Sequence, residues 1–209
     1  MIDISIDKKI RTYKGISRLV IETHIEKYSV TKVFGSSGSG KTTFLKILAG
    51  LISPESGNIA VDGEIWLDTG RHINLSPQQR QAAFVFQDYA LFPNMTVLAH
   101  LNYATSDNQL IERLLQIGKM SPFTAHKPNQ LSGGQQQRLA ILRALAMRPK
   151  LLLMDEAFSA LDDDLRESLI VDIKLLLKEF GTTTLIVSHH AQETVGFADH
   201  TLKIELEGK

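Results

Sequence analysis

The chain has 209 residues, enough for one domain of ordinary size or for one core with a smaller inserted lobe. Its 23 basic and 23 acidic side chains cancel, which gives no support for nucleic-acid binding or for direct attachment to a charged membrane surface. Because the chain has no cysteine, no run of ~20 apolar residues and no apolar leader, we exclude disulfides and thiol catalysis and expect a cytoplasmic protein without a membrane anchor of its own.

The first part of the chain is dominated by short apolar runs that predict strands. Apolar and polar residues alternate over residues 2–6 and 19–25, and residues 29–34 are typical of a buried strand. A glycine-rich turn follows, and a helix is predicted over residues 42–49. Prolines and glycines between residues 54 and 70 indicate an antiparallel stretch.

The second part of the chain changes in character. Residues 82–86 form a short apolar run, and residues 88–130 are helical in pattern but broken by prolines, so they are the candidate inserted lobe. Strands then alternate with helices, which indicates a largely parallel sheet covered on both faces. The predicted elements are a helix over 135–147, a strand over 151–154, a helix over 165–180, a strand over 184–187, a short helix, and a strand over 202–206.

The glycine-rich turn carries the sequence GSSGSGKT at residues 35–42, which fits the pattern G-x-x-x-x-G-K-[ST]. Glycines let the backbone wrap closely around phosphate oxygens, and the helix that follows directs its N–H groups and positive dipole end at them. Lys41 can reach the β- and γ-phosphates, and the Thr42 hydroxyl is the expected Mg²⁺ ligand. A flexible Gly/Ser turn is the alternative, but the strand–loop–helix context favours nucleotide binding.

The apolar strand over residues 151–154 runs into two adjacent carboxylates, Asp155 and Glu156. Because side chains alternate along a strand, the two cannot share one direction unless the chain turns there. That suits two tasks, with Asp155 directed to the Mg²⁺ shell and Glu156 to a water that attacks the γ-phosphate. A solvated strand end followed by a helix cap is the alternative. The neighbouring phosphate loop disfavours it, because parallel sheets gather such ligands at the carboxyl ends of their strands.

A second glycine motif, LSGGQ at residues 131–135, opens the long helix. Ser132 is a good N-cap candidate, and the paired glycines leave backbone N–H groups accessible for an anion. A Ser-Gly-Gly turn that caps an ordinary amphipathic helix is the alternative. Two phosphate-facing helix ends are hard to place around one nucleotide, which suggests that one of them serves a nucleotide held by a second copy of the chain.

Together these residues resemble the ATP-binding cassette (ABC) family, the ATPase subunits of ABC transporters, along nearly the whole chain. The resemblance rests on the phosphate loop at 35–42, on residues 131–135, which match the family signature, and on the acidic strand end. Gln87 matches the family's glutamine loop, residues 159–162 match its aspartate loop, and His189 matches its switch histidine.

The resemblance implies an α/β fold of the P-loop NTPase type, with a RecA-like core, an antiparallel β lobe and an inserted helical lobe. It implies a single ABC ATPase domain over 1–209, in which 1–87 and 136–209 form the nucleotide-binding core with the β lobe and 88–135 form the helical lobe. It also implies a head-to-tail homodimer formed with ATP, and a transmembrane permease whose cytoplasmic helix docks in a groove near residues 87–95. Nucleic acid is not an expected partner, and the solute itself is not contacted.

The resemblance further assigns roles to individual residues around ATP and Mg²⁺. Catalysis is assigned to Glu156, His189 and Gln87, and metal binding to Thr42, Gln87 and Asp155. Nucleotide contacts are implied for the phosphate loop, for the signature, for the aspartate loop and for an aromatic that stacks on adenine: Gly35, Ser36, Ser37, Gly38, Ser39, Gly40, Lys41, Thr42, Thr43, Ser132, Gly133, Gly134, Gln135, Asp162 and Tyr13.

The leading functional hypothesis is an ATPase that drives solute import from the cytoplasmic face of the inner membrane, bound there peripherally through the permease. Residues 86–93 look most like those of importers for molybdate, sulfate and similar solutes, so we predict molybdate or a related oxyanion. A soluble ABC ATPase of cofactor assembly and an exporter ATPase are the alternatives. Importer relatives often carry a C-terminal regulatory domain, which we do not expect here because the chain stops soon after Leu206.

Overall fold

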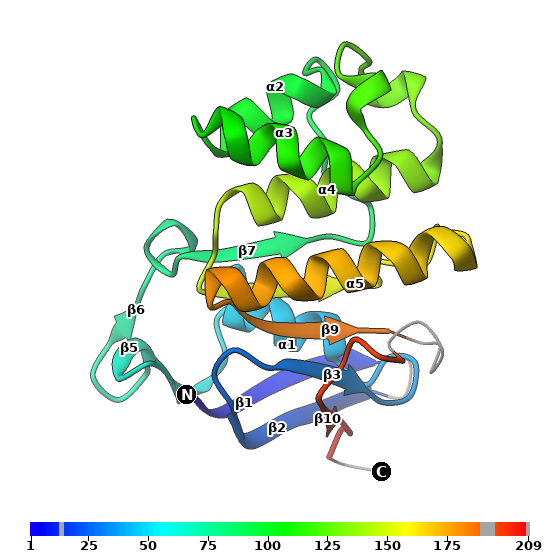
Figure 1. Cartoon of the computed structure of the whole chain (residues 1–209). Coiled ribbons are helices and arrows are strands. Elements are labelled where there is room, and N and C mark those ends of the chain that lie inside the picture. The colour runs from blue at the N-terminus through cyan, green and yellow to red at the C-terminus, as the bar shows by residue number, and fades with distance from the viewer. Residues whose placement is uncertain (13–14, 189–194, 208–209) are drawn as a thin grey trace.

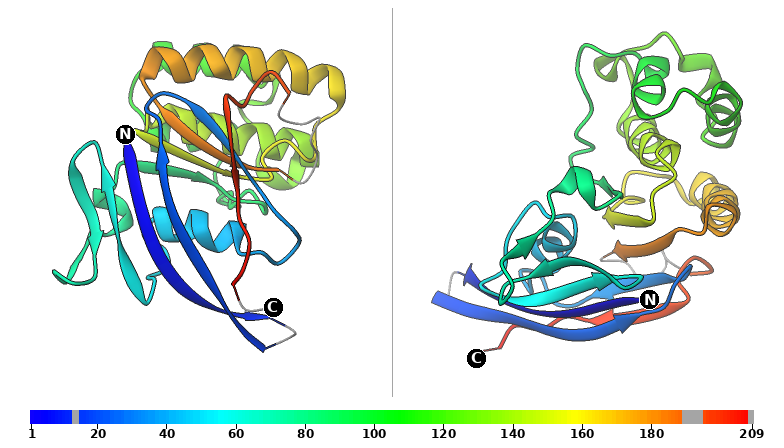
Figure 2. Two further views of the ribbon diagram at one scale, coloured as in Figure 1. Left: turned by 90° about the horizontal axis from the view of Figure 1, so that it is seen from below. Right: turned by 90° about the vertical axis from the view of Figure 1, so that its left-hand side faces the viewer.

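The computed structural model describes residues 1–12, 15–188 and 195–207. Two five-stranded sheets organise these residues, with strand orders β2-β1-β4-β5-β6 and β10-β3-β9-β8-β7. All pairings in the first sheet are antiparallel, and all pairings in the second are parallel. Figure 1 shows the helices α2 and α3 at the top of the molecule and the strands β1 and β2 at the bottom, and Figure 2 confirms that they lie at opposite ends.

The antiparallel sheet forms because apolar and polar side chains alternate along its strands. Ile2, Ile4 and Ile6 are 1%, 3% and 2% exposed, so they share one buried face, while the residues between them lie on the other face. The predicted strands and the predicted antiparallel stretch are therefore confirmed. The strands are β1 (Ile2–Thr12), β2 (Gly15–Ile25), β4 (Ser56–Val61), β5 (Glu64–Asp68) and β6 (Ile73–Asn74).

The parallel sheet is the buried centre of the fold. Its middle strands β8 and β9 are buried at every position, as expected for strands covered on both faces. The last strand differs from its predicted place at 202–206, because its pairing with β3 ends at Lys203 opposite Phe34. The strands are β3 (Val30–Phe34), β7 (Ala82–Val85), β8 (Leu151–Asp155), β9 (Thr183–Val187) and β10 (His200–Lys203).

Helices cover both faces of the parallel sheet. Two of the predicted proline breaks begin short 3₁₀ turns, at Ser121–Phe123 and Pro128–Gln130, and another 3₁₀ turn spans Pro77–Gln79. A short helix is predicted between residues 187 and 202, and residues 189–194 of this segment lie outside the described part of the chain. The α-helices are α1 (Lys41–Leu48), α2 (Val97–Ala104), α3 (Asn108–Ile117), α4 (Gly133–Ala146) and α5 (Asp163–Phe180).

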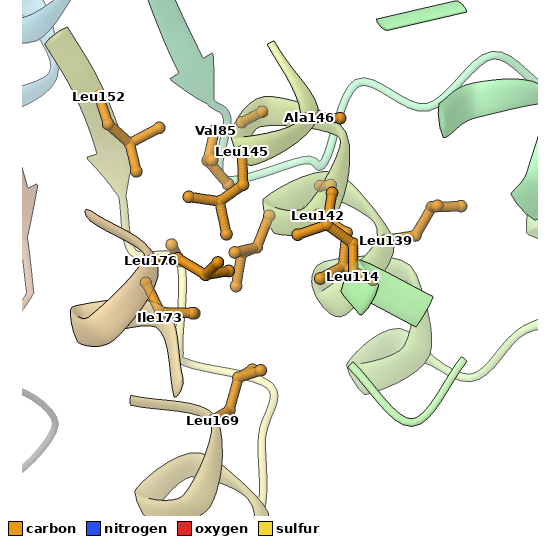
Figure 3. Close-up of a cluster of buried hydrophobic side chains, with 14 of the residues drawn as sticks. Val85, Leu114, Leu139, Leu142, Leu145, Ala146, Leu152, Leu169, Ile173 and Leu176 are labelled. Atoms are coloured by element: carbon orange, nitrogen blue, oxygen red, sulfur yellow. The ribbon is translucent and has the colours of Figure 1, made fainter. Parts of the chain in front are cut away.

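Two hydrophobic clusters fix the layers, one on each face of the parallel sheet. Alternate residues of β8 enter each cluster, with Leu151 and Leu153 in one and Leu152 and Met154 in the other. The first cluster also holds the buried side of α1 and the inner face of the antiparallel sheet. In the second, the α4 leucines lie between α3, α5 and the sheet (Figure 3).

The division into a core and an inserted lobe at 88–135 stays a prediction, because α2, α3 and the core helices share this second cluster. Among the helices of residues 1–12, 15–188 and 195–207, none has both the length and the apolar composition needed to cross a membrane.

Candidate functional site

The parallel strands bring their carboxyl ends to one edge of the sheet, and the predicted phosphate loop leaves β3 there. The loop needs its glycines. A Cβ at Gly35 would lie 2.2 Å from the carbonyl oxygen of Ile204, and Gly38 and Gly40 have left-handed φ values of 74° and 91°. Helix α1 follows directly at Lys41, without a side-chain cap and without an acidic residue in its first turn. Its first N–H groups are therefore left for an anion.

Lys41 lies inside the loop. Its ammonium donates to the carbonyl oxygens of Gly35 and Ser36, over 3.0 and 2.9 Å, and the residue is buried. Burial lowers the pKa of Lys41, and the carboxylates of Glu156 and Asp155 act against this shift. The loop thus holds a desolvated cation beside the free end of α1, where the negative oxygens of a phosphate chain would be stabilised.

The two adjacent carboxylates lie at the end of β8, where the chain turns at Glu156. Glu156 has a left-handed φ of 53°, and its N–H donates to the carbonyl oxygen of Val187. Asp155 points into the protein, is 3% exposed, and hydrogen-bonds Thr42, while its Oδ1 is buried without a hydrogen-bond partner among the described residues. Burial raises the pKa of Asp155, and the bond from Thr42 together with nearby cations opposes that rise.

Thr42 and Asp155 fit a magnesium ion. A buried carboxylate oxygen without a partner is expensive unless a cation neutralises it, and a hydroxyl beside it adds a second oxygen ligand. Within the described residues no three acidic or histidine side chains gather into a metal cluster. Mg²⁺ is commonly held by one or two protein ligands together with substrate phosphates and water.

Gln87 follows β7, the strand next to β8, and reaches the same edge. Its Nε2 donates to Glu156 Oε2 over 3.0 Å, so the structure brings these two predicted residues together. The loop after Gln87 is held by Arg143 of α4, whose guanidinium donates to the carbonyl oxygens of Tyr89 and Ala90 over 3.2 and 2.7 Å. Sequence reasoning missed Arg143, because its partners lie more than fifty residues away and no local pattern marks it.

The second glycine motif begins α4 as predicted. Ser132 is the N-cap, its Oγ accepts from Gln135 N–H over 3.3 Å, and Gln135 Oε1 accepts from Ser132 N–H over 2.8 Å. Ser132 and Gly133 are exposed on the surface. A Cβ at Gly134 would lie 2.9 Å from the carbonyl oxygen of Ala160, so this glycine allows close packing instead.

The remaining predicted site residues are a helix cap, two residues of the phosphate loop and α1, and two residues that the structure does not describe. Asp162 caps α5 by accepting from Leu165 N–H over 2.9 Å. Ser39 is buried with an Oγ that has no partner among the described residues, and Thr43 is half-buried on α1. Tyr13 and His189 lie outside the described part of the chain.

Comparisons with known proteins agree with this arrangement. The family model described as "ABC transporter" matches residues 20–159. A molybdenum import ATP-binding protein of Saccharophagus degradans is 40% identical over 190 residues, which cover 88% of this chain and 52% of the relative. A "probable sulfate/thiosulfate import ATP-binding protein" of Chlorella vulgaris is 36% identical over 209 residues, covering 96% and 85%. The solved dimeric structure of an ATP-binding cassette in a post-hydrolysis state with ADP and Pi gives a TM-score of 0.82 at 30% identity, covering 98% and 94%.

The fold and the phosphate loop define a cassette of the P-loop NTPase class, and the predicted fold class is confirmed. The chain belongs to the ABC transporter family. It spans about half the length of the molybdenum import relative and most of the sulfate/thiosulfate one.

Proposed function

We propose that this chain is the ATP-hydrolysing subunit of an ABC importer. One observation carries the proposal: Asp155 Oδ1 is buried without a hydrogen-bond partner among the described residues, and the Asp155 carboxylate lies beside Thr42, at the same strand edge as Lys41 and the uncapped start of α1. A desolvated cation, a free helix N-terminus and a buried carboxylate oxygen with no hydrogen-bond partner in the described part of the chain together fit the phosphates of ATP and a magnesium ion.

Binding follows from the charges of these groups. The N–H groups of residues 35–43 surround the phosphates, and Lys41 turns from its carbonyl partners Gly35 and Ser36 toward the β- and γ-phosphate oxygens. Thr42 and Asp155 hold Mg²⁺, with Gln87 as a further ligand. The ion neutralises the charge that develops on the phosphates. The assignment of Tyr13 to the adenine stays a prediction.

Hydrolysis follows from the position of Glu156. Asp155 is buried beside Thr42 whereas Glu156 is only partly buried, so one carboxylate serves the metal while the other orients and deprotonates a water in line with the γ-phosphate. Gln87 donates to Glu156 Oε2 and so fixes the rotamer of this base. The predicted role of His189 is a second contact to the γ-phosphate.

A second copy of the chain completes the site in this proposal. The start of α4, from Ser132 to Gln135, faces the γ-phosphate of the partner's ATP, and Asp162 lies at the same interface. The similar cassette solved as a dimer with ADP and Pi supports the formation of a dimer. The nucleotide then supplies much of the interface, so dimerisation depends on ATP.

The membrane partner is proposed from an apolar groove beside the Gln87 loop. The groove has a volume of about 440 Å³, and Leu51, Phe86, Phe92, Tyr103 and Met147 help to line it. Four of these five side chains are at least 40% exposed, which is unusual for large apolar residues on a soluble surface. A permease helix that covers them would hold the subunit peripherally on the cytoplasmic face of the membrane.

The transported solute is proposed to be molybdate or a related oxyanion, on the basis of the molybdenum and sulfate/thiosulfate relatives. We also propose that residues 88–135 form a helical lobe and that the rest of the chain forms the nucleotide-binding core. Cofactor assembly and export are the competing functions, and co-purification of the chain with a membrane protein of several spans separates transport from cofactor assembly.

ATP binding and hydrolysis by the purified chain test the proposal. Lys41→Ala is expected to lose nucleotide binding or turnover, because the cation at the phosphates is gone. Lys178→Ala removes an exposed cation from α5 and serves as the matched control, with binding and turnover unchanged. Equal nucleotide affinity and equal ATPase rates in wild type and Lys41→Ala would rule the phosphate site out.

A further inference from the structure

Gln137 is a buried amide on α4 that none of the predicted roles includes. It is 1% exposed, and among the described residues its side chain makes three hydrogen bonds, all to the turn after β8. Its Nε2 donates to the carbonyl oxygen of Glu156 over 3.0 Å and to Ser159 Oγ over 3.3 Å. Its Oε1 accepts from Ala160 N–H over 2.9 Å. The amide therefore uses both its donor and its acceptor on one short segment.

We infer that Gln137 is a positioning residue for Glu156, and this inference rests on the proposed function. A glutamate adopts a left-handed φ only where its surroundings hold it there. The Glu156 N–H is held by Val187, and the Glu156 carbonyl oxygen is held by Gln137 and by Ser159 Oγ, which donates over 3.0 Å. The direction of the carboxylate depends on this backbone.

The same contacts join the Glu156 turn to the glycine end of α4. Gln137 lies about one helical turn beyond Gly134, whose Cα packs against the carbonyl oxygen of Ala160. The start of α4 and the 156–160 turn are therefore tied together by an amide and by a close backbone contact.

Two substitutions separate the contacts of Gln137. Gln137→Met keeps the length of the side chain and loses all three hydrogen bonds. Gln137→Glu keeps an acceptor for Ala160 N–H and loses the donor to the Glu156 carbonyl oxygen. If Gln137 acts by positioning Glu156, both variants should hydrolyse ATP more slowly than wild type. Gln136→Met is the matched control, since Gln136 lies next to it and donates to two backbone carbonyls on the other side, those of Pro128 and Leu131.

The test measures ATPase rates and ATP affinity at saturating Mg²⁺. Both Gln137 variants are expected to lose roughly 10- to 100-fold in kcat, because small displacements of a reacting group are that costly, while ATP affinity stays within about twofold. Gln136→Met is expected to keep kcat within about threefold. In the double variant, Gln137→Met should lower kcat no further than Glu156→Gln does alone, because Gln137 acts through the base that is already missing.

The outcomes distinguish the two claims. If wild type hydrolyses ATP and Gln137→Met keeps its kcat, or if the losses of Gln137→Met and Glu156→Gln multiply, the positioning role is wrong and the proposed function stands. A lower unfolding temperature with an unchanged kcat identifies a purely structural role and also overturns the inference. If wild type hydrolyses no ATP, the proposed function fails and the inference fails with it.

Discussion

Arg80 hydrogen-bonds the carboxyl end of α1, the helix that begins at the phosphate loop, and its removal should destabilise the fold. The residue is 1% exposed, and its guanidinium donates to the carbonyl oxygens of Ile47 and Leu48 at the end of α1 over 2.7 and 2.8 Å. It also donates to Leu75 O over 2.9 Å and to Asn74 Oδ1 over 2.8 Å. Burial lowers the pKa of Arg80 to about 10, which leaves it charged at neutral pH, where every one of its partners is an acceptor.

The size of the effect follows from the buried carbonyl of Leu48. In Arg80→Met the Ile47 oxygen still accepts from Gly50 N–H over 3.0 Å, whereas the Leu48 oxygen loses its donor. A buried polar group left unsatisfied costs roughly 1–3 kcal/mol, so this is the expected loss. For a chain of about 200 residues, 1 kcal/mol corresponds to about 2–4 °C in Tm. The unfolding temperature should therefore fall by at least about 2 °C.

Trp66 makes the measurement direct. It is the only tryptophan of the chain, it is 1% exposed, and its ring centroid lies 6.0 Å from the Arg80 guanidinium carbon. Thermal unfolding followed by tryptophan fluorescence should show the fall in Arg80→Met. The exposed Arg71, in Arg71→Met, serves as the control and should shift stability by no more than about 0.5 kcal/mol. A Tm for Arg80→Met within about 1 °C of wild type would refute the reasoning.

Two further predictions concern His100 and Asp155. Burial lowers the pKa of His100, whose Nε2 accepts from Phe92 N–H, so the folded state keeps the ring neutral; its contribution to stability is present above about pH 6.5 and is lost as the pH falls below it. Urea unfolding at pH 7.5 and 5.5 measures how far the free energy of unfolding falls between the two pH values. This fall should be smaller in His100→Gln than in wild type, and an equal fall in both proteins would contradict the prediction. Asp155→Asn should raise the Mg²⁺ concentration for half-maximal ATPase activity by at least about tenfold, since it weakens the proposed metal shell; an unchanged requirement would remove Asp155 from that shell.

Much of the fold could be predicted because its signals are local. Alternation along β1 and β2, the apolar run of β8 and the capping residue of α4 each depend on neighbours in the sequence. The phosphate loop was predictable for the same reason. The position of β10 was not, because the alternation of Leu202, Ile204 and Leu206 continues beyond the residues that β3 can pair with.

The polar side chains that hold the site together were not predictable from local pattern. Arg80, Gln137 and Arg143 each bond backbone groups of another segment, and a buried amide or guanidinium has the same residue type as one on the surface. Their roles depend on contacts that exist only after the sheet and the helices have packed. The contact between Gln87 and Glu156, in contrast, could have been predicted. Each residue follows one of two neighbouring parallel strands, whose carboxyl ends lie at the same edge of the sheet.

Turnover and assembly of Glu156→Gln test the central claim most directly. The change keeps the shape of the side chain and removes the base, so ATP hydrolysis should fall roughly 10²- to 10⁴-fold. ATP binding should persist, because Lys41 and the phosphate loop are untouched, and gel filtration should find the variant as an ATP-bound dimer where the nucleotide-free chain is mainly monomeric. Near-normal ATP turnover by Glu156→Gln would contradict the account and remove Glu156 from its catalytic role.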